Sequence, residues 1–240
     1  AGGGMTFDRH RYGEDNYLYL LADGEDAVLV DPADPEVAME ASRRRGVHPR
    51  WILHTHGHHD HSGGSARLRV ELGAEVIGHG ADAAWFAPDR DLAGATQLTL
   101  GKLHLRILAA PGHTPGSVLL EWRGKLLTGD TLFWSGCGNC RHGGDPARLA
   151  ATFRTVFPGL DPRLEVHPGH DYAEANLKFV LDLEPSNQAA ARRLAAVRAA
   201  RSARVEPEAS ELGEEALVNP FLRAGSDEAF VWLRGRRDRW

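Results

Sequence analysis

THGHHDH, from Thr55 to His61, is the stretch on which the interpretation of this chain depends. It directly follows the apolar run WIL and holds four histidines and one aspartate. A short apolar run that ends in polar residues indicates a buried strand followed by a loop, and binding residues gather on such loops. Imidazole and carboxylate groups this close together are potential metal ligands. A complete metal site would need further ligands from elsewhere in the chain.

The first 172 residues alternate short apolar runs with turn residues, which predicts a fold rich in strands. The predicted strands are two in 16–32 around the turn Asp23-Gly24, one at 51–56, one at 75–79, a hairpin in 96–113, a second hairpin in 117–130 and a last strand at 164–170. Helices are expected at 35–46, where Gly46 would close the helix, and at 62–73.

After Tyr172 the strand patterns stop, and alanine, arginine, leucine and glutamate dominate. The segments 173–185 and 186–202 are predicted to be helices, the second with Ser186 as its N-cap. We therefore expect an α/β (α+β) domain over residues 1–172 and a helical domain over 173–240. No Gly/Ser linker separates them, so the helices are expected to pack on the first domain.

Histidines and aspartates recur wherever a predicted strand ends in a loop. The set is His56, His58, Asp60, His61, His113, Asp130 and His170. Ligands that follow several strands converge when those strands end at one edge of a sheet. These residues exceed what one ion of four to six ligands needs, so we predict a two-metal site.

In this interpretation each ion has its own ligands. One ion would be held by His56, His58 and His113, and the other by Asp60, His61 and His170, with Asp130 as a bridge between them. A lone histidine beside a strand is most often a hydrogen-bonded surface group, and this is expected for His10, His48, His79, His104, His142 and His167. For His54 and His59 we expect a supporting or spacer role.

Composition excludes several classes of partner. The net charge is -5 and no lysine/arginine-rich block precedes an apolar segment, which argues against a nucleic-acid partner. No apolar stretch reaches the roughly 18 residues of a membrane span. Two cysteines in 240 residues do not make a disulfide framework, so a reducing cytoplasm is expected. No long amphipathic stripe indicates a dimer, so a monomer is expected. We expect Met5 to be the native start, preceded by an added AGGG segment.

The spacing H-x-H-x-D-H, followed by distant P-G-H, G-D and G-H motifs, resembles the metallo-β-lactamase superfamily from about Asn16 to His170. That resemblance implies an αββα sandwich with a metal site at one edge. Further segments look like glyoxalase II (hydroxyacylglutathione hydrolase), whose C-terminal part is helical. They are DNYLYLL, GDTLFWSGCG, GHDYAEANLKF, NPFLR and FVWLRGRRDRW.

The resemblance to glyoxalase II implies an enzyme that hydrolyses S-(2-hydroxyacyl)glutathione, with S-D-lactoylglutathione giving glutathione and D-lactate in methylglyoxal detoxification. It implies two divalent ions, zinc ahead of iron or manganese, and no organic cofactor. Asp60 and Asp130 would be catalytic because, as metal ligands, they orient the nucleophile. Tyr172 would contact glutathione, and Arg234 and Arg237 would bind its glycine carboxylate, as paired arginine N–H groups do.

One loop departs from the pattern of glyoxalase II. GCGNCRHGGDP, from Gly136 to Pro146, lacks the usual aromatic residue, and its basic side chain moves to Arg141. The thiol carrier could therefore be held differently or not be glutathione. Cys137 and Cys140 form a C-x-x-C pattern, which could be a redox pair or half of a zinc site, but two ordinary thiols fit the context better.

Two other classes of function stay open from the sequence. A related persulfide dioxygenase would use a single iron held by His56, His113 and Asp130. A non-catalytic module that binds a metal or a thiol conjugate is the second alternative. Without the resemblance, the segment RGRRDR would be interpreted as a solvated charged tail.

Overall fold

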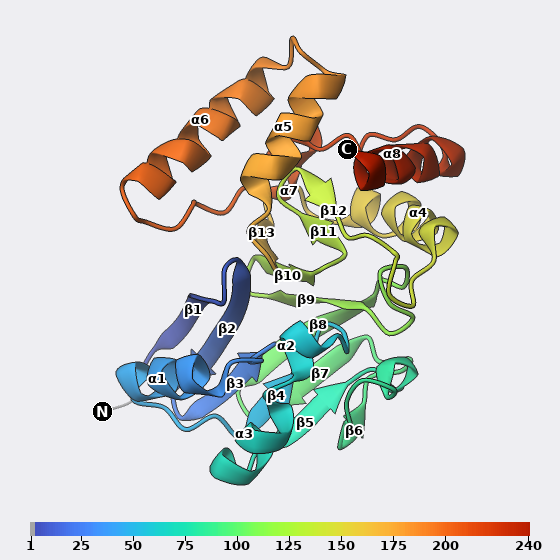
Figure 1. Ribbon diagram of the computed structural model, residues 1–240. Helices are drawn as coiled ribbons and strands as arrows, with labels where there is room; N and C mark the ends of the chain where they lie inside the picture. Colours follow the sequence, from blue (N-terminus) through green and yellow to red (C-terminus); the bar gives the residue numbers. More distant parts are fainter. Residues whose placement is uncertain (1–2) are drawn as a thin grey trace.

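Two β-sheets packed face to face form the centre of the computed structural model, which describes residues 3–240 (Figure 1). The first sheet contains, in spatial order, β1 (Met5–Tyr12), β2 (Asn16–Asp23), β3 (Asp26–Val30), β4 (Trp51–Leu53), β5 (Glu75–Gly78) and β6 (Arg90–Asp91). The second sheet contains β13 (Glu165–Pro168), β10 (Lys125–Gly129), β9 (Val118–Trp122), β8 (Leu103–Ala109) and β7 (Gln97–Leu100). A separate short hairpin joins β11 (Leu132–Phe133) and β12 (Gly136–Cys137).

The side chains of β2 alternate between two hydrophobic clusters, one between the sheets and one under the outer helices. Successive side chains of a strand point to opposite faces of its sheet. Tyr17, Tyr19 and Leu21 are therefore buried between the two sheets, while Leu18 and Leu20 are buried on the other face. That outer face is covered by α1 (Pro35–Arg45) and α3 (Ser65–Leu72), whose apolar residues share its core.

Helices also lie on the side of the second sheet, which completes the expected αββα arrangement (Figure 1). These helices are α4 (Pro146–Thr155), α5 (Ala173–Leu183), α6 (Gln188–Ser202), α7 (Leu212–Val218) and α8 (Asp227–Arg239). Their apolar residues, among them Leu149, Leu177 and Phe230, belong to the same hydrophobic cluster as the apolar residues between the sheets. The RGRRDR segment is thus part of a helix, α8, whose Phe230 and Arg234 are buried.

Helix α4, strand β6 and the hairpin β11–β12 were not predicted, and three further details differ from the sequence-based expectations. Strand β1 was not predicted, because MTFDRHRY is polar and its pairing with β2 is long-range information. The helix expected at 62–73 is divided into α2 (His59–Ser62) and α3. The N-cap of α6 is Asn187 rather than Ser186, since the Asn187 side chain accepts from the backbone N–H of Ala190.

The remaining features concern the chain ends and short turns. Single 3-10 turns occur at η1 (Gly80–Asp82) and η2 (Phe157–Gly159). Ala1 and Gly2, part of the expected added segment, lie outside the described residues. Within residues 3–240, none of the helices combines the length and the apolar character needed to cross a membrane.

The sheet topology brings the ends of several strands to one edge. Strands β3, β4 and β5 are parallel neighbours in the first sheet, and β10 and β13 are parallel neighbours in the second. Parallel neighbours end on the same side of a sheet. The loops that follow β4, β10 and β13, together with the loop after β8, therefore carry their polar residues toward one place.

Candidate metal centre and adjoining cavity

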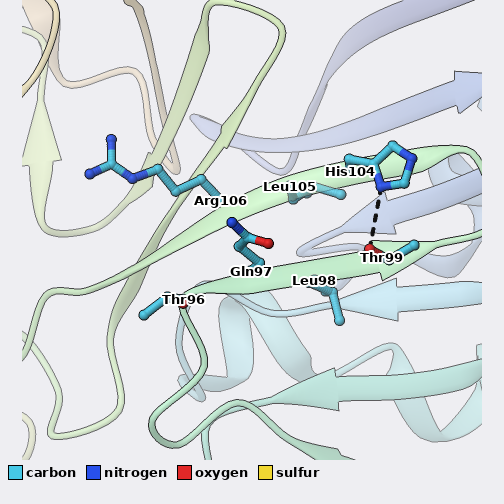
Figure 2. A pocket seen from close by; sticks show the side chains of 7 residues that line it. All are labelled: Thr96, Gln97, Leu98, Thr99, His104, Leu105 and Arg106. Carbon is cyan, nitrogen blue, oxygen red and sulfur yellow. Dashed lines mark hydrogen bonds between the residues drawn. The ribbon is translucent and has the colours of Figure 1, made fainter.

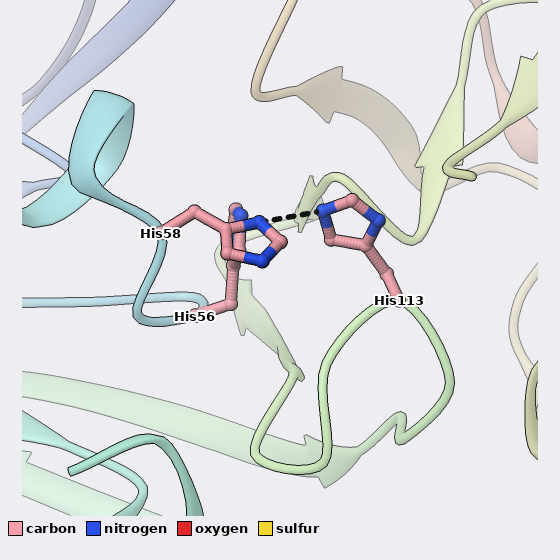
Figure 3. A group of neighbouring side chains, drawn as sticks. All are labelled: His56, His58 and His113. Atoms are coloured by element: carbon pink, nitrogen blue, oxygen red, sulfur yellow. Dashed lines mark hydrogen bonds between the residues drawn. The ribbon is translucent and has the colours of Figure 1, made fainter. Parts of the chain in front are cut away.

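The seven metal-ligand candidates form two adjacent groups. The three-histidine group consists of His56, His58 and His113 (Figure 3). The acidic group consists of Asp60, His61, Asp130 and His170. Within each group, one potential ligand atom per residue lies within 4.8 Å of all the others. The structure thus brings together the two sets that the sequence divided between two ions.

In the three-histidine group, hydrogen bonds on the outer ring nitrogens decide which nitrogens are free to bind an ion. Nε2 of His58 lies 2.9 Å from the carbonyl oxygen of His142, and Nδ1 of His113 lies 2.6 Å from that of Asn139. A carbonyl only accepts, so both of these nitrogens carry hydrogen. The inner atoms, Nδ1 of His58 and Nε2 of His113, face each other at 3.1 Å. In the neutral imidazoles both carry lone pairs, an arrangement that a cation between them would stabilise.

The acidic group repeats this pattern with charged partners. Nδ1 of His61 lies 3.1 Å from Oδ2 of Asp31, and Nδ1 of His170 lies 2.8 Å from Oδ1 of Asp15. The Nε2 atoms of His61 and His170 then face each other at 3.1 Å. A carboxylate behind a ligating imidazole fixes its tautomer and makes the inner nitrogen a better metal ligand.

Asp130 lies between the two groups. Its Oδ2 is 3.4 Å from Nε2 of His113 and 3.3 Å from Nε2 of His170, and its Oδ1 is 3.2 Å from Nε2 of His61. Among the described residues, Nε2 of His56 and Oδ1 of Asp130 are buried and have no hydrogen-bond partner. Buried polar atoms without partners are costly. Nitrogen and carboxylate donors converging in this way fit one or two divalent ions.

The pKa directions show where positive charge is favoured. Burial, followed by the charge of His61, holds the pKa of His56 well below its ordinary value. Burial also opposes protonation of His61, but Asp130 and Asp31 outweigh it and raise the pKa of His61 to about 10. Burial opposes ionisation of Asp130, yet the surrounding histidines hold its pKa well below the usual range. Positive charge is therefore favoured at His61, in the acidic group, and disfavoured at His56, in the three-histidine group.

Asp82 fixes two ligand loops to each other. This fully buried carboxylate accepts hydrogen bonds from the N–H of Gly57 at 2.9 Å, from Oγ1 of Thr114 at 2.7 Å and from the N–H of Gly116 at 2.8 Å. Gly57 separates His56 from His58, and Thr114 follows His113. One side chain thus sets the distance between the two loops of the three-histidine group.

At Gly129 and Gly169, each directly before a ligand, there is no room for a side chain. Gly129 has φ of 51°, which favours glycine, and a Cβ there would come within 2.5 Å of Oγ1 of Thr55. A Cβ on Gly169 would come within 2.4 Å of Oδ1 of Asp130 and 2.7 Å of Cε1 of His61. The G-D and G-H motifs therefore have a steric origin.

Three residues that support the ligands were missed from the sequence: Asp15, Asp31 and Asp82. Asp31 follows the run AVLV and so carried the same strand-end signal as the ligands. Its φ of 51° and its bonds to His54, Thr55 and His61 could not be read from the sequence. His54, expected to support the site, also contacts Ser65. His142, interpreted as an ordinary surface histidine, supplies its carbonyl to His58.

A cavity of about 320 Å³ adjoins both ligand groups. It is lined by Phe133, Cys137, Asn139, Arg141, Tyr172, Asn176, Arg234, Arg237, Asp238 and Trp240. Asn139 supplies the carbonyl oxygen that orients His113. The ring of Tyr172 stacks on His170, with centroids 4.7 Å apart and planes inclined by 8°. All four residues predicted to bind the thiol substrate line this cavity.

The three arginines of the cavity differ in the hydrogen bonds that they already make within the chain. Arg234 is 6% exposed, and its guanidinium donates to the carbonyl oxygen of Cys137 at 2.6 Å and to Asp238. Arg141 donates to the carbonyl oxygen of Asp238 at 2.7 Å. The hydrogen bonds of Arg237, to Oδ1 of Asn176, are long, at 3.5 Å, and its guanidinium lies over the ring of Trp240, 5.1 Å from the centroid. Arg237 is therefore the arginine best placed to accept a new anionic partner.

The two cysteines are both free thiols. Burial raises the pKa of Cys137 to about 11 and that of Cys140 to about 12. A thiol that stays protonated at neutral pH is a poor nucleophile and a poor starting point for disulfide exchange. This chemistry favours the interpretation of Cys137 and Cys140 as ordinary thiols, of which Cys137 lines the cavity.

A second hollow, of about 470 Å³, lies on the outer surface of the hairpin β7–β8 (Figure 2). It is lined by Thr96, Gln97, Leu98, Thr99, His104, Leu105 and Arg106. None of these residues belongs to either ligand group. The site chemistry is therefore assigned to the cavity beside Tyr172.

Comparison with protein families matches two descriptions to the chain. "Metallo-beta-lactamase superfamily" covers residues 12–186, and "Hydroxyacylglutathione hydrolase C-terminus" covers residues 171–240. A hydroxyacylglutathione hydrolase from Anaeromyxobacter dehalogenans is 58% identical, with 98% of this chain and 100% of that protein covered. One from Acidiphilium cryptum is 38% identical, with 99% and 98% covered.

Solved structures show the same fold. ETHE1 from Myxococcus xanthus superimposes with a TM-score of 0.72 at 24% identity, covering 96% of this chain and 90% of that one. TTHA1623 in a di-iron-bound form superimposes with a TM-score of 0.66 at 28% identity, covering 90% of this chain and 100% of that one. The first of these likenesses concerns the fold alone.

The sandwich and the ligand clusters at its edge place the chain in the metallo-beta-lactamase superfamily. This class includes many functions, so the C-terminal helices and the close relatives carry the finer assignment. Within the superfamily, the chain belongs to the hydroxyacylglutathione hydrolase family. The resemblance predicted from the sequence is confirmed.

Proposed function

We propose that this chain hydrolyses the thioester of S-(2-hydroxyacyl)glutathione, with S-D-lactoylglutathione giving glutathione and D-lactate. The proposal includes a binuclear centre of two divalent ions, zinc ahead of iron or manganese. One observation carries it. The inward-facing ligand atoms of the three-histidine group and of the acidic group meet at Asp130, next to the cavity that contains Arg237. Membership of the hydroxyacylglutathione hydrolase family supports the choice of substrate.

Divalent ions held by the two groups would make water available as a nucleophile at neutral pH and would polarise the acyl carbonyl. Asp60 and Asp130 would hold and orient the attacking water. Asp60 suits this role because its side chain is 49% exposed, although its Oδ2 lies 3.0 Å from Nε2 of His170. The leaving group is a thiolate whose conjugate acid has a pKa of about 8.5, so no dedicated general acid is required.

The cavity would receive the thiol half of the substrate. Tyr172 would position it next to His170, and Arg237 would bind the glycine carboxylate through its guanidinium N–H groups. Arg234 would help by holding Arg237's helix against the loop at Cys137. In this proposal residues 1–172 supply the chemistry, and residues 173–240 supply most of the contacts to the thiol carrier.

In the cell, this reaction would remove the thioester formed from methylglyoxal and glutathione. We propose a cytoplasmic monomer. Two free thiols without a disulfide are consistent with a reducing compartment. Sedimentation at micromolar concentration would measure the mass directly.

The first experiment is turnover of S-D-lactoylglutathione by protein loaded with zinc, iron or manganese. S-lactoyl esters of other small thiols are the comparison substrates. Fast turnover of the glutathione ester is the expected result. If only another thiol ester is turned over, the carrier assignment is wrong. If none is hydrolysed and oxygen is consumed with glutathione persulfide, the dioxygenase function replaces the hydrolase function.

The second experiment tests the cavity through Arg237→Met. Loss of one arginine–carboxylate pair is expected to raise KM for the glutathione ester about tenfold, with kcat little changed. Arg236→Met is the matched control, since Arg236 is exposed on the same helix and lies over Trp232 instead. An S-lactoyl ester of mercaptoethanol, which has no carboxylate, should not distinguish Arg237→Met from the unaltered protein.

A further inference from the structure

The turn between β1 and β2 reaches over the acidic group and contacts two of its ligands. Oδ1 of Asp15 lies 2.8 Å from Nδ1 of His170. Nδ2 of Asn16 donates to Oδ2 of Asp60 and to its carbonyl oxygen, both at 3.2 Å. The two residues are neighbours in sequence and serve two different ligands, from loops that follow different strands.

The backbone locks this turn to the ligand loop. The N–H of Asp171 donates to the carbonyl oxygen of Asp15 at 2.8 Å, and the N–H of Tyr17 donates to that of Gly169 at 2.9 Å. Tyr12, at the start of the turn, donates its hydroxyl to the carbonyl oxygen of Asp60 at 2.6 Å. The side chains of Asp15 and Asn16 are therefore placed by a framework that does not depend on an ion.

Asp60 and His170 are the ligands for which such support matters. His61 is completely buried, and Asp130 is 8% exposed, so packing alone restricts their motion. The Asp60 side chain is 49% exposed and, without Asn16, would lose a donor that restricts its rotamer. Without Asp15, the ring of His170 would lose the acceptor that keeps hydrogen on Nδ1 and leaves Nε2 free.

We propose that Asp15 and Asn16 are positioning residues that hold His170 and Asp60 in place, so that the β1–β2 turn controls retention of the ion at the acidic group. This inference rests on the proposed binuclear centre. Asp15 acts by orienting the imidazole of His170 and by making its inner nitrogen a better metal ligand, and Asn16 acts by fixing the carboxylate of Asp60. Neither residue touches the substrate.

The test is metal binding to purified full-length protein, measured by competition with a chromophoric chelator for zinc. The variants are Asp15→Ala, Asp15→Asn and Asn16→Ala. Asp15→Ala is expected to weaken one of two ions by about 10- to 100-fold and to leave the other unchanged. Asp15→Asn keeps an acceptor for His170 but loses the charge, so its effect should be smaller. Glu14→Gln, an exposed neighbour, removes the same charge without a contact to His170 and should bind zinc normally.

The outcomes separate the inference from the proposed function. Two ions in Asp15→Ala with unaltered affinities overturn the inference, as does equal weakening of both ions. A single ion in the unaltered protein overturns the binuclear centre, and the role of Asp15 is then judged by whether Asp15→Ala weakens that ion. The thermal midpoint of the metal-free variants shows whether folding is affected. If Asp15→Ala does not fold, the graded effect of Asp15→Asn decides.

Discussion

The three-histidine group and the acidic group both contain inward-facing histidine nitrogens, but the two groups are supported differently. The outer nitrogens of His58 and His113 donate to the main-chain carbonyls of His142 and Asn139. The outer nitrogens of His61 and His170 donate to the carboxylates of Asp31 and Asp15. One group is therefore surrounded by neutral partners and the other by negative charge.

Histidines in the two groups therefore lie in different electrostatic surroundings, because their outer nitrogens have different partners. Carboxylates stabilise a cation at short range, while carbonyls fix geometry with less charge. The neutral partners also belong to the loop Gly136–Pro146, which borders the cavity. We expect affinity to be dominated by the acidic group, and sensitivity to the substrate loop to be greater in the three-histidine group.

The largest effect should come from the residue the two groups share. Asp130→Asn keeps the size of the side chain but removes the charge close to both groups. We expect kcat/KM to fall by on the order of 10³-fold, with loss of bound metal. Steady-state kinetics and metal analysis of the same sample would measure this. Unchanged metal content and activity would show that Asp130 belongs to neither site.

The next largest effect is expected from Asp31, whose carboxylate contacts Nδ1 of His61. Asp31→Asn breaks a buried cluster that serves His54, Thr55 and His61, so we expect a loss of about 3 kcal/mol in the free energy of unfolding. Thr55→Val removes one hydroxyl, which donates to Asp31 and contacts Nδ1 of His56, and should cost about 1 kcal/mol. Urea denaturation of the metal-free proteins gives both numbers. Equal costs would contradict the central role of the Asp31 carboxylate in this cluster.

A smaller effect, confined to one group, is expected for Asp82→Ala. The variant leaves Gly57, Thr114 and Gly116 without their acceptor, which should cost about 2 kcal/mol of stability. Since Asp82 joins the loops of the three-histidine group, zinc affinity there should fall while the acidic group keeps its ion. Chelator competition would measure both affinities. Preferential loss from the acidic group would be the opposite of this expectation.

The smallest effect per pH unit is expected at His167, a buried histidine with only a long contact, 3.8 Å, to a carboxylate oxygen of Glu165. Burial, followed by the charges of Arg9 and Lys125, lowers the pKa of His167 to about 3. An unfolded histidine titrates near 6.5, so between pH 6.5 and 3 the unfolded state binds the proton. Stability should therefore fall as pH falls, by about 1 kcal/mol per pH unit.

His167→Leu removes this contribution. The metal-free variant should lose less stability than the unaltered protein between pH 6.5 and pH 4.5, as measured by urea denaturation at each pH. Parallel pH dependence of the two proteins would mean that His167 is protonated in the folded state. His167 would then resemble His61, whose pKa is raised to about 10, although it lacks the close carboxylates that surround His61.

The ligands themselves were predictable because each follows an apolar strand. His56, His113, Asp130 and His170 all occupy loops after β4, β8, β10 and β13. Residue type and strand-end position were enough to select them and to divide them into two sets. Their coordinating roles remain a prediction, and the metal binding experiments above test it.

The partners of the ligands were not predictable, since they depend on contacts between distant segments. Asp15 and His170 are separated by 155 positions, and Arg234 and Cys137 by 97. Nothing in the local pattern of either residue indicates the other. The same applies to β1, whose polar sequence becomes a strand only because β2 offers it a pairing edge.

By itself, the sequence determined the alternation of strands and helices, the family and the set of candidate ligands, because periodicity and short motifs are local properties. The tertiary structure alone decided which ring nitrogen of each histidine faces inward, which arginine is buried and which carboxylates stand behind the site. These depend on how the two sheets and the C-terminal helices pack, and packing brings together charges and acceptors that are far apart along the chain.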